Sequence, residues 1–326
     1  MLVELESGVA MAVSEARNFA FSDLRFQAVN TFQDIIATFG RTILKKKVDF
    51  PVKSPWIVAL LGKSAVEVVN AKYQIYNLND PPVFDDVSWI APGKVIRDMQ
   101  LSTESSKEVI DVLEQIGGKY VLLDAGWYGP ETNPASDATT WLKNPKKAPL
   151  DIEVITQYGK SKGIGVILYV NDIALSRQLE DILPLYNQWG VAGIKFGFVE
   201  LDKSEDIARI LHYVKRCGEH RLVVNIHDNY RPSGISRTYP NLLSIEGIRG
   251  DEHTPNAKHS VMLPFLRYTY GVRLAFPVDW PQRWRFITTL SRGPVRRSRP
   301  YPPRPAGGRR RALMSWLLPP PATRHR

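Results

Sequence analysis

The sequence predicts an α/β fold: a (β/α)8 barrel of the TIM type, incomplete, preceded by a remnant of a β-sandwich domain. Two observations on the 326-residue chain predict this fold. Short apolar runs alternate with amphipathic stretches of helical length, which is typical of parallel strands joined by helices. Most of the apolar runs also end in polar residues, and the carboxyl ends of the strands carry the active site in such barrels.

Hydrophobic periodicity and turn residues locate the individual elements. Five predicted strands are 120–124 (YVLLD), 165–171 (GVILYVN), 193–198 (GIKFGF), 222–227 (LVVNIH) and 242–246 (LLSIE). Four predicted helices are 105–116, 151–162, 176–189 and 203–217. Upstream, residues 66–76 (VEVVNAKYQIY) alternate in polarity and are rich in Val, Ile and Tyr, which predicts further strands.

An open, doubly wound sheet is the alternative to the barrel, because it also places ligands at the carboxyl ends of its strands. The sequence has no G-x-G-x-x-G turn after a first strand, so the usual signature of such a sheet is missing. The barrel is therefore the preferred fold.

Composition divides the chain into three parts. Residues 1–80 are predicted to be a partial N-terminal β-sandwich domain, 81–280 the (β/α) barrel, and 281–326 a disordered tail rich in Arg and Pro. Residues 283–326 contain 12 Arg and no Lys, Asp or Glu, so the net charge of +10 belongs to the tail and the remaining residues carry −2. The tail is either non-native sequence or an arm for nucleic acid, and the body gives no charge signal for a nucleic-acid partner.

Several classes of protein are excluded or disfavoured. Cys217 is the only cysteine, so an internal disulfide is ruled out and the redox compartment stays open. We find neither a signal-peptide pattern nor an apolar stretch of the ~20 residues that a membrane span needs. We expect no membrane or nucleic-acid partner and a monomer or weak dimer, and we assign no cellular location.

Two polar constellations are candidates for chemistry. Asp124 leaves a strand directly into Ala125-Gly126-Trp127-Tyr128, and a sugar offers hydroxyl groups to a carboxylate and an apolar face to an indole. Capping by Asp124 and core packing by Trp127 remain the alternative. Residues 225–253 gather His, Asp, Glu and Arg at two strand ends, which suits metal coordination, general acid/base work or a structural ion-pair network.

Four segments carry a resemblance to glycoside hydrolase family 97: 87–97 (VSWIAPGKVIR), 123–130 (LDAGWYGP), 189–199 (WGVAGIKFGFV) and 227–252 (HDNYRPSGISRTYPNLLSIEGIRGDE). The similarity runs from about residue 67 to about residue 267. It implies a calcium-dependent α-glucosidase or α-galactosidase that acts on α-linked oligosaccharides. Family members have an N-terminal β-super-sandwich, a central barrel and a C-terminal β-domain, so the chain resembles a truncated member.

The resemblance also implies roles for particular residues. Glu252 matches the general acid, and Asp228 is placed as general base or calcium ligand, with Glu200 as a further candidate base because of its strand-end position. Ca²⁺ is expected as cofactor, with Glu15, Asp228, Glu246 and Glu252 as its ligands; Glu15 lies in a Ser-Glu-Ala match that an ordinary surface Glu would also give. Asp124, Trp127, His227 and Arg249 are expected to contact the sugar.

Two departures from the family pattern bear on the mechanism. Gly197 stands where the retaining branch has its Asp nucleophile, which is expected to leave space for a water. The resemblance therefore points to the inverting, α-glucosidase-like branch, whose mechanism needs two carboxyl groups roughly 6.5–9.5 Å apart. Asn229 stands where inverting relatives have Glu, and an amide cannot accept the proton. The alternative function is therefore a catalytically impaired remnant that binds carbohydrate or calcium.

Overall fold

The computed structural model describes residues 7–21, 53–141, 148–201, 203–227, 230 and 233–245. It also describes the backbone of the strands at 2–4, 24–29, 34–39 and 284–285. Most of the predicted tail at 281–326 lies outside these residues, as do Asp228, Glu246, Arg249 and Glu252.

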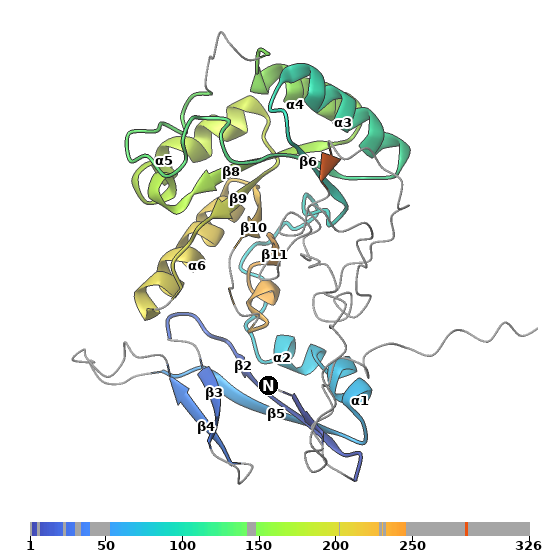
Figure 1. Cartoon of the computed structure of the whole chain (residues 1–326), viewed down its shortest axis with the longest axis vertical. Helices are drawn as coiled ribbons and strands as arrows, with labels where there is room; N and C mark the ends of the chain where they lie inside the picture. The colour runs from blue at the N-terminus through green and yellow to red at the C-terminus, as the bar shows by residue number, and fades with distance from the viewer. Residues whose placement is uncertain are drawn as a thin grey trace, which may run out of the picture.

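Six parallel strands curl into half a barrel (Figure 1). They are β6 (Val95–Asp98), β7 (Tyr120–Leu123), β8 (Gly165–Asn171), β9 (Gly193–Gly197), β10 (Val223–Ile226) and β11 (Leu242–Ile245). Each pairs with the next along the chain, and the two-residue β12 (Trp284–Arg285) pairs antiparallel with β6. Because this order never reverses, the sheet is of the barrel type and not doubly wound, which confirms the predicted fold class.

Four helices cover the outer face of the sheet (Figure 1). They are α3 (Thr103–Gln115), α4 (Ile152–Ser161), α5 (Asp172–Trp189) and α6 (Ser204–Glu219). Local signals define the ends of the first three: Ser102, Asp151 and Asn171 accept hydrogen bonds from backbone N–H groups of the first turns, and Gly190 ends α5 at φ +75°. All four predicted helices and all five predicted strands are confirmed, and β6 is an additional strand.

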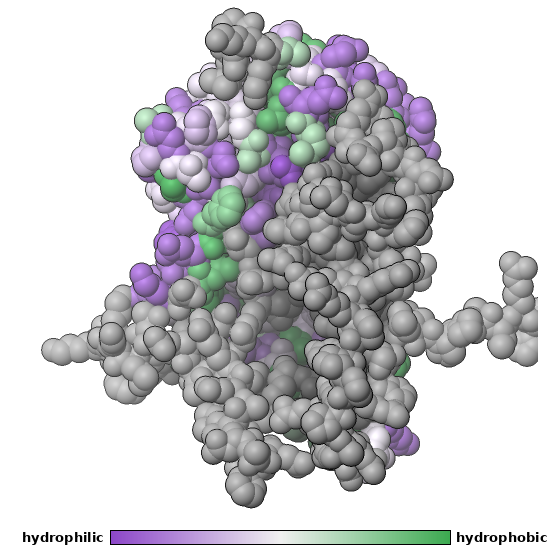
Figure 2. Space-filling model, viewed as in Figure 1, coloured by the Kyte–Doolittle hydropathy of each residue, from purple (hydrophilic) through white to green (hydrophobic). Residues whose placement is uncertain are grey.

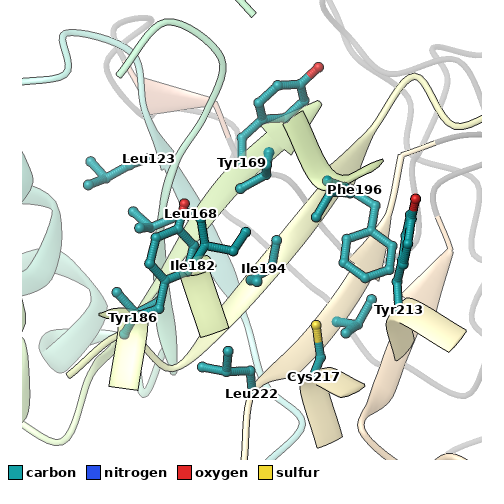
Figure 3. Close-up of a cluster of buried hydrophobic side chains, with 14 of the residues drawn as sticks. Leu123, Leu168, Tyr169, Ile182, Tyr186, Ile194, Phe196, Tyr213, Cys217 and Leu222 are labelled. Atoms are coloured by element: carbon teal, nitrogen blue, oxygen red, sulfur yellow. The ribbon is translucent and has the colours of Figure 1, made fainter. Parts of the chain in front are cut away.

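The main core lies between the strands and these helices (Figure 3). Leu123, Leu168 and Ile194 from the sheet meet Ile182 and Tyr186 from α5, and all five are fully buried. In the view of Figure 2 the described surface over the helices is mostly hydrophilic, as expected for helices with one face on a core.

The N-terminal part forms separate antiparallel sheets. Strands β1 (Leu2–Glu4), β2 (Ala10–Ala16) and β5 (Trp56–Gly62) make one sheet, and β3 (Leu24–Val29) and β4 (Asp34–Phe39) make a two-stranded ribbon. These strands agree with the predicted β-rich character of this part.

The strands predicted at 66–76 are wrong, because α1 (Ala65–Asn70) and α2 (Tyr73–Asn77) lie there. The Ser64 hydroxyl caps α1 by accepting from the Glu67 N–H at 3.3 Å. Ala65 and Val68, three residues apart, are buried with Ala10 and Leu60 of the sheet. Helix capping and this spacing outweigh the β propensity of the Val residues.

Hydrogen bonds join the N-terminal part to the segment after β10. The Arg17 N–H and the Asn79 side-chain amide both donate to the Ser233 carbonyl, at 3.2 and 2.9 Å. The Thr238 hydroxyl donates to the Asp80 carbonyl at 2.9 Å. We call these contacts the seam.

Within the described residues, no helix is both long enough and apolar enough to cross a bilayer.

Candidate functional site

The two faces of the curled sheet carry different side chains. Residues of one parity, among them Ile96, Val121 and Leu168, pack under the helices. Residues of the other parity face the inside of the half-barrel, and at the amino ends of the strands they form a separate apolar cluster of Val95, Tyr120, Leu122, Ile167 and Val223.

The inner face becomes polar toward the carboxyl ends of the strands. Register pairs Tyr169 with Lys195, and Lys195 with Asn225, which pairs with Ser244 on β11. Asp124 follows β7 and has the same parity as Leu122. We call Asp124, Tyr169, Lys195, Asn225 and Ser244 the polar row. It lies where a TIM barrel places its catalytic groups.

Two members of the polar row, Asp124 and Lys195, form an ion triad with the partly exposed Arg97 of β6. The Lys195 Nζ lies 3.2 Å and the Arg97 Nε 3.0 Å from Asp124 Oδ2. The side chains of Lys195 and Asp124 are only 3% and 6% exposed. Oδ1 of Asp124 accepts from the Ala125 N–H at 2.8 Å. The two cations and the carboxylate thus hold one another in fixed positions.

The protonation state of Asp124 follows from these partners. Burial favours the neutral acid, but Lys195, then Arg97, then the Ala125 N–H favour the anion, and together they hold the pKa of Asp124 below its usual range. Asp124 is therefore ionised near neutral pH. It can orient cations and accept hydrogen bonds, but it has no proton to give to a leaving group.

Tyr169 fills the space beside Gly197. A Cβ atom added to Gly197 would lie 2.1 Å from ring atoms of Tyr169. The ring is almost fully buried, burial raises the pKa of its hydroxyl, and the Asn171 amide donates to that hydroxyl at 3.3 Å. The expectation that Gly197 leaves space for a water is therefore wrong, because a neutral phenol occupies that volume.

Below Lys195 and Tyr169, the inner face encloses a small cavity of about 20 Å³. Its lining includes Tyr120, Val223 and Asn225. The Asn225 amide donates to the Ser244 hydroxyl at 2.7 Å, and its buried Oδ1 has no hydrogen-bond partner among the described residues. The volume suits about one water molecule and is far too small for a sugar, so this cavity is not the sugar site.

The rim beyond the polar row is formed by the residues that follow β9 and β10. The Phe198 and His227 rings lie 5.1 Å apart, centroid to centroid. The His227 N–H donates to the Phe196 carbonyl at 2.9 Å, which ties the two strand ends together. Glu200 lies further along this rim and is exposed, and its charge adds to the burial that raises the pKa of Asp172.

The structure places five of the predicted site residues. Asp124 follows β7 and His227 follows β10, so both lie at the carboxyl ends of strands, with β8 and β9 between them. Trp127 is 1% exposed, and its indole N–H donates to the Tyr169 carbonyl at 2.6 Å, so it packs in the core, the alternative that the sequence left open. Glu15, on β2, is 6% exposed and is therefore not an ordinary surface Glu. Glu200 stands apart from the triad on the rim.

The roles assigned to Asp228, Glu246, Arg249 and Glu252 fall on residues outside the described ones, so they stay predictions. Conversely, sequence reasoning missed Arg97, Lys195 and Tyr169. A signal existed for two of them: Arg97 and Lys195 are charged residues inside otherwise apolar strands, and Lys195 has the same parity as the strand-end position 197.

Comparison with known proteins finds relatives among carbohydrate-active enzymes. Residues 90–248 match the family model Glycoside hydrolase 97. A retaining alpha-galactosidase of Bacteroides thetaiotaomicron is 30% identical over 256 residues, which cover 72% of this chain and 37% of the relative. A probable retaining alpha-galactosidase of Streptomyces bingchenggensis is 28% identical over 81% of this chain and 43% of its own length.

Solved structures agree with the fold. A glycoside hydrolase family 97 enzyme from Pseudoalteromonas sp. strain K8, in complex with acarbose, superposes with a TM-score of 0.66 at 24% identity, covering 76% of this chain and 43% of that one. A beta-arabinopyranosidase gives 0.61 at 18% identity, covering 77% and 42%. The chain thus spans 37% and 43% of the curated relatives' lengths. Over residues 90–248, the chain belongs to glycoside hydrolase family 97.

Proposed function

We propose that the chain carries the barrel part of an α-glycosidase that releases terminal α-linked galactose or glucose from oligosaccharides. The observation that carries this proposal is the Asp124–Lys195–Arg97 triad at the carboxyl ends of barrel strands, inside the segment that matches the family. The two curated relatives are both named α-galactosidases, which puts galactose beside glucose as a substrate to test.

The sequence and the relatives point to different stereochemical outcomes. The sequence predicts inversion because Gly197 offers no nucleophile and leaves room for water, but Tyr169 fills that room. The names of both curated relatives say retaining, which conflicts with inversion. Retention needs two carboxyl groups roughly 5–5.5 Å apart, with one as nucleophile, and Gly197 supplies none.

Particular residues receive roles in this proposal. Glu252 is the general acid that protonates the leaving oxygen, and Asp228 or Glu200 is the second carboxylate, which would take a proton from the attacking water in an inverting reaction. Asp124 stays ionised and holds the Lys195 ammonium group in place, so that Lys195 can donate to a sugar hydroxyl. His227 and Arg249 complete the sugar contacts.

Calcium is part of the proposal, with Glu15, Asp228, Glu246 and Glu252 as its ligands. Among the residues that the structure describes, no group of three or more His, Cys, Asp or Glu could hold a metal ion. Glu15 fits in one respect, since it is a buried carboxylate two residues before Arg17, which is bonded to the segment after β10. Calcium, when bound, would fix carboxylate positions and polarise a sugar hydroxyl.

Hydrolysis of melibiose and maltose by the 326-residue chain tests the proposal. Changing Glu252→Gln is expected to lower kcat by about 10²–10⁴-fold, because the sugar oxygen that leaves in these substrates loses its proton donor. Proton NMR of the first product formed reads out the anomer and so decides between retention and inversion. Equal rates for the variant and the unmodified chain would show that Glu252 is not the acid.

The second candidate is a sugar- or calcium-binding protein without turnover. It is favoured by the coverage of 37% and 43% of the curated relatives, and by Gly197 and Asn229 at positions where family members have carboxylates. Calorimetry with maltose, melibiose and Ca²⁺ beside the activity assay separates the two. Binding with no detectable product supports this second function.

A further inference from the structure

Phe198 has a backbone conformation that its side chain disfavours. Among the described residues, four that are not glycine have a positive φ, and Phe198 is the aromatic one, at φ +50°. In this left-handed region the Cβ atom crowds the backbone, so a bulky residue here is strained. Such strain persists where surrounding structure or function maintains it.

Burial of the Phe198 side chain does not offset the strain in its backbone. Its side chain is 57% exposed, whereas its neighbours Gly197 and Val199 are buried. A large aromatic ring that is both exposed and strained adds little to folding stability, because little of its apolar surface is removed from water and its backbone conformation costs free energy. The combination is typical of a residue that is retained for binding.

The ring stands at the mouth of the proposed sugar site. Phe198 directly follows β9, whose inner face presents Lys195 and Gly197, and its ring lies 5.1 Å from that of His227 at a tilt of 42°. It is three positions after Lys195 in the sequence, which is roughly 10 Å of extended chain at the rise of a strand. A sugar held by Lys195 and Asp124 therefore lies deeper than one that touches Phe198.

We propose that the exposed, left-handed Phe198 is an aromatic platform for the pyranose ring on the leaving-group side of the α-glycosidic bond. This inference rests on the proposed function. The C–H face of a pyranose is apolar and packs flat on an aromatic ring, while its hydroxyl groups at the edge reach polar partners such as His227. The terminal sugar enters first and binds at the polar row, and the next unit lies over Phe198.

A Phe198→Gly variant tests the platform, because glycine removes the ring and the strain together. The complete chain in a Glu252→Gln background keeps the disaccharide uncleaved during calorimetry. We expect the Phe198→Gly variant to melt at a higher temperature than its parent. We also expect it to bind maltose and melibiose about tenfold more weakly, since one stacking contact contributes on that order. Binding of methyl α-glucoside and methyl α-galactoside is expected to be unchanged.

Two controls separate the effect of the ring from that of the backbone. Arg221→Gly relieves a left-handed residue at φ +56° just before β10, at the opposite end of the strands, and is expected to raise the melting temperature without changing sugar binding. Phe198→Leu keeps an apolar branched side chain without a flat face, and is expected to lose disaccharide affinity without gaining stability.

Three outcomes would overturn the platform. Disaccharide binding by Phe198→Gly as tight as that of the parent would remove its role. Equal losses for disaccharides and methyl glycosides would place the ring away from the leaving-group side. If the parent binds none of these sugars, the proposed function itself fails and the platform fails with it, a result already visible without any change at Phe198.

Discussion

Asp124 is expected to stabilise the inner face through its charge. Asp124→Asn keeps the shape of the side chain but removes the carboxylate charge beside the Lys195 ammonium, which is 3% exposed. Breaking one partner of a buried ion pair costs about 3–5 kcal/mol. We expect a loss of this order in the free energy of unfolding at pH 7, measured by urea denaturation. The matched control is Asp111→Asn, whose pair with Lys162 is at the surface, and it is expected to cost less than about 1 kcal/mol.

The parent and Asp124→Asn also allow a test of how the difference in unfolding free energy changes with pH. Because the folded-state pKa of Asp124 lies below its unfolded value of about 3.9, its stabilisation is present in full above about pH 4 and is lost as the pH falls through the folded pKa. The difference in unfolding free energy between the parent and Asp124→Asn should therefore shrink below about pH 4. A difference of the same size at pH 7 and pH 3 would contradict the assigned ionisation.

Residue identity alone revealed only part of the site. Asp124 could be recognised because it ends an apolar strand, and its placement on the inner face agrees with that reasoning. Trp127 could not be placed, because an indole beside a strand end suits a sugar surface and a core equally well until its partners Tyr128 and Tyr186 are known. Lys195 and Arg97 could not be assigned to the site, because their contact with Asp124 joins three strands that are far apart in the sequence.

At the scale of elements, β8 and β9 are fitted to each other through Tyr169 and Gly197. Gly197→Ala is expected to cost about 1–3 kcal/mol of unfolding free energy, because the added methyl group overlaps the phenol ring. In a Tyr169→Ala background the ring is absent and the same change should cost much less. Tyr169→Phe is the control, since it keeps the ring and should keep the full cost.

Denaturant unfolding of the resulting mutant cycles measures this coupling. A coupling energy near zero between Gly197→Ala and Tyr169→Ala would mean that the two strands can move apart freely. Contact with Tyr169 would then not explain why position 197 is glycine. A coupling of about 1 kcal/mol or more would show that a carboxylate cannot be restored at position 197 without also changing Tyr169.

The elements themselves can be predicted where an apolar run is continuous and has clear boundaries. Residues 165–171 and 193–198 were predicted as strands and form β8 and β9, because an apolar run bounded by glycine suits a strand covered on both faces. Residues 66–76 were mispredicted, because Val-rich stretches shorter than two helical turns fit both periods. There the Ser64 cap and the spacing of Ala65 and Val68 decide for helix, a balance that a count of β-branched residues does not contain.

At the scale of the whole molecule, the proposed calcium ligands come from two parts of the chain. Glu15 lies in the N-terminal part, the other ligands follow β10, and the seam joins the N-terminal part to the segment after β10. A ligand that binds only the folded chain raises its stability by about 2.7 kcal/mol at one hundred times its Kd. We expect CaCl2 to raise the melting temperature relative to EGTA, and Glu15→Gln to reduce that rise because one carboxylate is lost.

The control for this change is Glu104→Gln, an exposed carboxylate in the first turn of α3. It should leave the calcium-dependent rise unchanged. An unaltered rise in Glu15→Gln would remove Glu15 from the ligand set, and no rise in the parent would remove calcium from the proposal. A measurement with MgCl2 in place of CaCl2 shows whether the rise in melting temperature is specific for calcium.

The change along each strand from an apolar amino end to a polar carboxyl end has a consequence for how such a molecule evolves. Side chains such as Val95, Tyr120 and Ile167 hold the sheet together without touching a substrate, whereas Asp124 and Lys195 lie where a substrate would arrive. New specificities can accumulate at one end while the other keeps its ancestral contacts. Tyr169 is the exception, because it leans from its own strand across Gly197, so a lineage that recruits a carboxylate at position 197 has to replace the aromatic residue first.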